Sequence, residues 1–128
     1  MDGVTLTIPA RPDFVHVIRS VVASVAARAD FSFDAIDDLR LAVDEACAQL
    51  LSFRPGATVL EIEIAWDQDG LEVVAAIDGD ATEWPPPGSE DTLTWQVLAA
   101  LADEATFDRT HAGPAVRLRK RREVAGAV

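Results

Sequence analysis

Two polar side chains four residues apart, Glu45 and Gln49, have the clearest capacity for chemistry in this sequence. In a helix this spacing places both side chains on one face. A carboxylate and an amide on one face could together orient a hydroxyl group and the water shell of a cation. A solvated Glu–Gln pair on a helix surface is the plainer interpretation, and these two residues alone do not decide between the two.

A second candidate is Asp78, which directly follows an apolar run with the character of a strand and precedes Gly79. A carboxylate at the end of a strand can accept hydrogen bonds from the exocyclic amine of a bound base. The same Asp-Gly-Asp sequence is also an ordinary beginning of a loop. The roles of all three residues therefore depend on the elements that position them.

Apolar periodicity predicts those elements. Alternation predicts strands over residues 4–8, 58–66, 71–77, 105–110 and 115–120, and helical spacing predicts helices over about 12–29, 34–53 and 92–103. The stretch from 78 to 91 is rich in proline and glycine, which predicts a loop. The order β-α-α-β-β-α-β-β predicts an α+β fold, with helices covering one face of an antiparallel or mixed sheet.

Length and composition restrict the class of protein. The 128 residues suit a single domain over 1–128, and 49% apolar with 26% charged residues is typical of a globular chain. The net charge of −11 argues against nucleic acid as a partner. The single cysteine, Cys47, excludes an internal disulfide and a multi-cysteine zinc cluster, so we assign no metal site. Without a membrane-spanning apolar run or a signal peptide, we expect a cytoplasmic protein with no membrane contact.

The charge is unevenly distributed along the chain. Residues 1–116 carry 6 basic and 21 acidic side chains, whereas residues 117–128 carry 5 basic and 1 acidic. This basic run is either a last strand with a solvated, flexible tail over 121–128, or a patch that meets an acidic partner or the acidic body of a second subunit.

Several stretches in order resemble one protein family. They are L-R-L-A-V-D-E-A-C at 39–47, I-D-G-D at 77–80, L-A-A-L-A-D-E at 98–104 and the closing segment 113–121. Together they resemble the RsbW-like anti-sigma factor and serine kinase family, part of the GHKL (histidine-kinase-like ATPase) superfamily. The resemblance covers about residues 4–122. It implies a two-layer α/β sandwich that holds a nucleotide between its helices and its sheet.

The resemblance assigns roles residue by residue. Glu45 matches the family's N-box glutamate, a general base toward a hydroxyl group or water. Gln49 stands where the family has an asparagine that binds magnesium, and Asp78 matches the aspartate that recognises the adenine amine. The additional methylene of Gln49 displaces its amide oxygen, and the octahedral shell of magnesium tolerates little error.

Both glycine boxes of the family are altered. The D-x-G-x-G box is D-G-D-A-T at 78–82, and the G-x-G-L box is E-D-T-L at 90–93. Glycines let backbone N–H groups approach phosphates, whereas Glu90 and Asp91 place negative charge there. The lid between the boxes carries three prolines at 85–87, which are stiff and donate no backbone hydrogen bonds. We therefore expect binding of ATP and magnesium to be weak or lost.

The resemblance also implies protein partners. Members of this family hold a sigma factor away from RNA polymerase, and a STAS-domain anti-anti-sigma factor competes for them. Arg19 matches a first-helix arginine used at the partner surface, with a solvated surface arginine as the alternative. The family is also dimeric, which makes a homodimer an expectation.

Three functional hypotheses follow from the resemblance. The leading one is a regulator that sequesters a sigma factor and has a degenerate ATP site. The alternative is an ATP-dependent serine kinase that phosphorylates the STAS partner, with Glu45 as base and Gln49 as an adapted magnesium ligand. A third is a regulatory module that binds only a STAS protein.

The aromatic residue of the lid, Trp84, has two open interpretations. It is either an exposed anchor for a partner or a side chain packed down over the vacant phosphate site. We expect Trp66 and Cys47 in the core, and His16 and His111 at the surface.

Overall fold

The computed structural model describes residues 2–122, which form five strands, three α-helices and two short 3-10 helices. In chain order they are β1 (Asp2–Pro9), η1 (Pro12–Phe14), α1 (Val15–Arg28), α2 (Phe33–Phe53), β2 (Val59–Trp66), β3 (Gly70–Ile77), η2 (Ser89–Asp91), α3 (Leu93–Leu101), β4 (Glu104–Arg109) and β5 (Pro114–Arg121).

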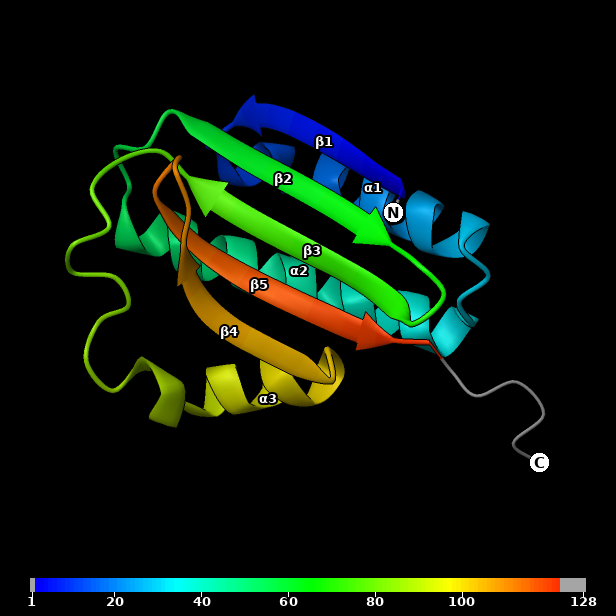
Figure 1. Cartoon of the computed structure of the whole chain (residues 1–128). Helices are drawn as coiled ribbons and strands as arrows, with labels where there is room; N and C mark the ends of the chain where they lie inside the picture. Colours follow the sequence, from blue (N-terminus) through cyan, green and yellow to red (C-terminus); the bar gives the residue numbers. More distant parts are fainter. Residues whose placement is uncertain (1, 123–128) are drawn as a thin grey trace.

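The strands form one sheet in the order β1-β2-β3-β5-β4, and every neighbouring pair is antiparallel. Helices α1 and α2 lie against one face of this sheet and α3 flanks β4, while within residues 2–122 the other face carries no helix (Figure 1). This confirms the predicted α+β fold of helices over one side of a sheet. The long segment between β3 and α3 runs along the end of the sheet where β3 stops (Figure 1).

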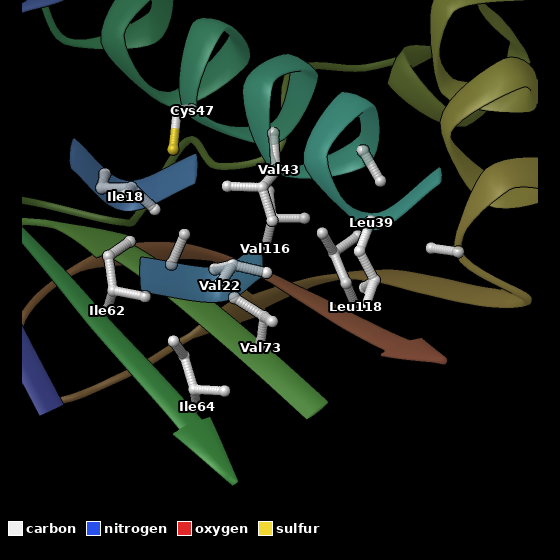
Figure 2. Close-up of a cluster of buried hydrophobic side chains, with 14 of the residues drawn as sticks. Ile18, Val22, Leu39, Val43, Cys47, Ile62, Ile64, Val73, Val116 and Leu118 are labelled. Atoms are coloured by element: carbon white, nitrogen blue, oxygen red, sulfur yellow. The ribbon is translucent and has the colours of Figure 1, made fainter. Parts of the chain in front are cut away.

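The core forms because alternate residues of the strands point toward the helices. Ile62, Ile64 and Val73 of the sheet lie beneath Val22 of α1 and Val43 of α2 (Figure 2). Cys47 is buried in the same layer as predicted, and burial raises the pKa of its thiol to about 12, with the charge of Asp44 adding to the effect. Trp66 is half-buried and packs against the edge of the core.

Capping residues set where the helices begin. The Ser32 hydroxyl accepts a hydrogen bond from the Ala35 amide at 3.2 Å, so α2 begins at Phe33. Thr92 caps α3 in the same way through the Trp95 amide at 3.1 Å. The predicted first helix is divided, because its first residues Pro12–Phe14 form a 3-10 turn before α1.

The basic C-terminal run remains part of the fold beyond residue 121, where the predicted tail begins. Arg121 is the last residue of β5. The Arg122 guanidinium donates to the carbonyls of Ala29 and Asp67 and lies 4.9 Å from the centre of the Phe31 ring. Both arginines therefore belong to the folded domain, and the rest of the predicted tail, 123–128, lies outside the described residues.

Candidate functional site

A pocket of about 710 Å³ lies between α2 and the segment that leads into α3. Its α2 side is built from residues on successive turns of one helix face. Its opposite side comes from the proline-rich segment and the first turn of α3. The lining residues are Glu45, Ala48, Gln49, Ser52, Phe53, Trp84, Pro86, Ser89, Thr92 and Thr94.

Glu45 and Gln49 lie together in this pocket, as their spacing predicts. Both side chains are half-buried. Among residues 2–122 neither makes a hydrogen bond or an ion pair. Their carboxylate and amide groups are thus available to a ligand. Phe53, one further turn along α2, belongs to the same face, and this i+4 spacing was a signal that the sequence analysis did not use.

Asp78 does not line this pocket. At the end of β3, its Oδ1 accepts hydrogen bonds from the backbone amides of Thr58 and Val59, both at 2.8 Å, and its Oδ2 accepts one from the Thr58 hydroxyl at 2.7 Å. The Thr58 hydroxyl and then the Val59 amide hold the pKa of this carboxyl down, at about 2. Both carboxylate oxygens are therefore engaged within the chain.

Arg54, the residue after α2, covers the backbone that follows Asp78. Its Nη1 donates to the Asp80 carbonyl at 3.4 Å. Gly79 has a φ of +126°, and a Cβ placed there would lie 2.3 Å from the Arg54 Nε. Nothing in the local sequence around Arg54 indicates that its side chain lies over Gly79.

Trp84 is packed down into the protein, with 2% of its surface exposed. Its indole Nε1 donates to the Ala115 carbonyl at 2.9 Å, and its ring centre lies 4.9 Å from that of Phe53 and 5.3 Å from that of Phe107. Arg109 donates two hydrogen bonds to the Trp84 carbonyl, at 2.7 and 3.1 Å. The structure confirms that Trp84 packs into the protein, so Trp84 is not an exposed anchor.

The lid carries acidic residues next to the pocket. Gly88, with a φ of +79°, begins the turn η2, in which Glu90 and Asp91 are exposed. They directly follow Ser89 and precede Thr92, two of the lining residues. The negative charge predicted at the second glycine box thus lies in an exposed turn between two lining residues, and Glu90 and Asp91 themselves line a separate hollow.

Arg19 lies on α1, outside the pocket. Its Nε is 2.8 Å from Oδ1 of Asp44, and its side chain is about one third exposed. The pair joins α1 to α2 at the residue before Glu45. The structure thus gives Arg19 an internal partner, and its predicted contact with another protein stays a prediction.

A family described as "Histidine kinase-like ATPase domain" matches residues 8–120. The anti-sigma-F factor RsbW of Mycobacterium tuberculosis is 38% identical over 103 residues, which are 80% of this chain and 59% of that protein. The serine-protein kinase RsbW of Bacillus subtilis is 31% identical over 136 residues, covering 93% of this chain and 85% of the kinase. This chain thus spans less than two thirds of the length of the mycobacterial relative.

A solved structure supports the fold independently. The crystal structure of the RsbU and RsbW domains of a Mycobacterium tuberculosis protein superposes with a TM-score of 0.73 at 13% identity, over 100% of this chain and 35% of that one. Among residues 2–122, no helix is long and apolar enough to cross a membrane.

Proposed function

Because the chain belongs to the histidine kinase-like ATPase domain family, we propose that it is an anti-sigma factor that sequesters an alternative sigma factor and is countered by a STAS-domain anti-anti-sigma partner. Its relatives carry the names anti-sigma-F factor and serine-protein kinase. The proposal includes a cytoplasmic location, a homodimer and a nucleotide site that is degenerate.

The observation that carries the degenerate site is the engagement of Asp78. An adenine amine would have to compete with the three hydrogen-bond donors that Thr58 and Val59 supply. The residues that line the neighbouring pocket include no lysine, arginine or histidine to hold a triphosphate. Glu90 and Asp91, in the turn between the lining residues Ser89 and Thr92, add charge of the same sign as phosphate to this segment. Two like charges 4 Å apart repel by about 4 kcal/mol at an effective dielectric constant of about 20. These residues do not fit ATP with magnesium.

The acidic surface supports a basic partner. Residues 1–116 hold 21 acidic and 6 basic side chains. Sigma factors present basic surfaces to DNA, and complementary charge accelerates association. Arg19 is the residue of α1 that we assign to this contact, and a partner would have to draw it away from Asp44.

A protein serine kinase is the second candidate function. It is favoured by one observation, which is that Glu45 and Gln49 face the same pocket without partners among residues 2–122. In that case Glu45 would accept the proton of a serine hydroxyl on the STAS protein. Bound ATP would supply the phosphoryl group.

Two measurements test the proposal. In a calorimetric titration with ATP and ADP, with and without magnesium, we expect no heat at millimolar nucleotide from the folded protein. Micromolar binding that depends on magnesium would contradict the degenerate nucleotide site and would favour the serine kinase function. In a pull-down analysed by mass spectrometry we expect a sigma factor, and recovery of a STAS protein alone would contradict sequestration.

A further inference from the structure

The pocket beside α2 has the electrostatic character of a site for a cation. Glu45 is the charged residue among the ten that line it. Glu90 and Asp91 are exposed in the turn η2, between the lining residues Ser89 and Thr92 in sequence, and line a separate hollow with Pro85–Pro87. A cationic ligand entering here would gain from the Glu45 carboxylate, whereas an anionic one would be repelled by it.

The nearest arginines do not neutralise this charge, because each has a role elsewhere. Arg54 lies against Gly79 and donates to the Asp80 carbonyl. Arg109 donates to the Trp84 carbonyl, and Arg19 is paired with Asp44. The Glu45 carboxylate thus faces the pocket without a cationic partner in the described part of the chain.

The remaining lining suits a flat, delocalised cation. Ala48, Phe53 and Pro86 provide apolar walls, while the Gln49 amide offers an acceptor one turn from Glu45. Two of the hydroxyls are already used, because Ser89 donates to the Pro86 carbonyl and Thr92 donates to the Ser89 carbonyl. A guanidinium group fits this arrangement better than an ammonium group, because it is less strongly hydrated and bonds a carboxylate through two parallel N–H groups.

Exposed apolar side chains on the same two helices indicate that the cation arrives on a protein. Leu93 and Val97, one turn apart on α3, are 76% and 50% exposed. Leu41, one turn before Glu45 on α2, is 55% exposed. These three exposed side chains belong to the two helices that supply lining residues, since Thr94 follows Leu93 on α3 and Leu41 is one turn from Glu45 on α2. Free arginine would leave them uncovered, whereas a chain segment with apolar residues around an arginine would bury them.

We propose that this pocket receives an arginine side chain of the protein partner. The arginine bonds Glu45, with Gln49 as a second acceptor, and apolar neighbours of the arginine contact Leu41, Leu93 and Val97. This inference rests on the proposed function, since it needs a basic protein partner and a pocket free of nucleotide.

The test uses a matched pair of synthetic peptides and two variants that alter one lining residue each. One peptide is a twelve-residue acetylated peptide with a central arginine flanked by leucines, and the other carries neutral citrulline in place of that arginine. Titration followed by protein NMR gives the dissociation constants and locates the contact. We expect the arginine peptide to bind at least tenfold more tightly and to shift the amide signals of α2 residues 45–52.

The variants separate this pocket from general attraction to an acidic surface. Glu45→Gln keeps the shape of the side chain and should reduce the preference for arginine to about twofold. Glu63→Gln, an identical change on an exposed residue of β2, should leave the preference intact. Gln49→Glu adds a second carboxylate and should increase the preference several-fold. Equal losses in the Glu45 and Glu63 variants, or no preference for arginine, would overturn the inference.

The outcome is distinguishable from failure of the proposed function. The pull-down could recover no sigma factor while the arginine peptide still binds more tightly and loses that preference in Glu45→Gln. This result would refute the sigma factor as partner and keep the assignment of the pocket to an arginine. Alternatively, the pull-down could recover a sigma factor whose binding is unchanged by Glu45→Gln, with no preference for the arginine peptide. This result would keep the proposed function and refute the assignment of the pocket to an arginine.

Discussion

Asp78 and Thr58 are twenty residues apart in the sequence and are joined by two hydrogen bonds, one from the Thr58 amide to Oδ1 and one from its hydroxyl to Oδ2. This contact ties the beginning of β2 to the end of β3. It also engages the carboxylate to which the resemblance assigns recognition of the adenine amine. One pair of residues therefore connects the stability of the sheet to the proposed loss of nucleotide binding.

The first prediction concerns acid stability. The folded protein lowers the pKa of Asp78 from 3.8 to about 2, so this carboxylate stabilises the fold above about pH 4 and loses that contribution as the pH falls toward 2. Thr58→Val removes the hydroxyl donor, which should cost on the order of 1 kcal/mol at neutral pH and flatten the acid dependence. Denaturant unfolding at several pH values measures both effects.

Three other carboxyl groups contribute to the same acid dependence of stability, so the Thr58→Val variant has to be compared with the wild type. Asp67, Asp80 and Asp108 also have lowered pKa values and lose stabilisation in the same direction. Because Thr58→Val leaves them in place, the difference between the two proteins isolates Asp78. An unchanged slope between pH 4 and 2 would contradict the role assigned to the Thr58 hydroxyl.

The second prediction concerns Lys120, which is 9% exposed. Its Nζ donates to the Leu101 carbonyl at the end of α3 at 3.0 Å and lies 3.6 Å from carboxylate oxygens of Asp38 and Asp103. Lys120→Met keeps the aliphatic stem and leaves that carbonyl without its donor, so the free energy of unfolding should fall by about 1–3 kcal/mol. Arg119→Met, the same change one residue earlier, should cost less than about 0.5 kcal/mol. Equal losses in the free energy of unfolding for the two variants would show that both act only through the net charge.

Periodicity predicted the elements well because the core is ordered by alternation and by helical spacing. The same alternation in β5 places Val116, Leu118 and Lys120 on the helix side of the sheet, so the inward position of Lys120 was available from the sequence. The basic run was interpreted as a last strand with a solvated tail, or as a patch that meets a partner, and the strand is confirmed. In the structure, Arg117 pairs with Glu72 and Asp108, and Lys120 pairs with Asp38 and Asp103.

The site was predictable only where its residues share a helix. A spacing of four placed Glu45 and Gln49 in one pocket. The partner of Asp78, Thr58, directly precedes β2, and its distance from Asp78 depends on how β2 pairs with β3, which no local pattern encodes. The same holds for Trp84, whose indole bonds the Ala115 carbonyl on β5, 31 residues away.

The third prediction concerns that tryptophan. Trp84→Ala should destabilise the protein by about 3–5 kcal/mol, since it leaves a cavity between Phe53 and Phe107. Trp84→Phe keeps most of the volume and removes the donor to the Ala115 carbonyl, so a smaller loss of about 1–3 kcal/mol is expected. Thermal and chemical unfolding give both values. A loss below 1 kcal/mol in the alanine variant would mean that Trp84 does not support this end of the sheet.

The fourth prediction separates the two possible roles of Arg19. If it contacts the partner, Arg19→Ala should weaken binding of the sigma factor recovered in the pull-down by about 1–2 kcal/mol. Asp44→Ala breaks the same internal pair and leaves the arginine available, so it should weaken binding less or strengthen it. Isothermal titration with both variants measures the difference. Matching losses would assign Arg19 to the α1–α2 contact alone.

The fifth prediction concerns Gly79 and Arg54. Gly79→Ala combines an unfavourable positive φ with a Cβ only 2.3 Å from the arginine Nε, and should cost about 1–3 kcal/mol. In an Arg54→Ala background the steric part disappears, so the cost of the same substitution should fall by at least about 0.5 kcal/mol. Gly88→Ala is the matched control, because Gly88 also has a positive φ but has no atom within 4 Å of its would-be Cβ. Its cost should be the same with and without Arg54. If both glycine substitutions respond alike to Arg54→Ala, the guanidinium does not lie over Gly79, and the backbone after Asp78 is open to a ligand.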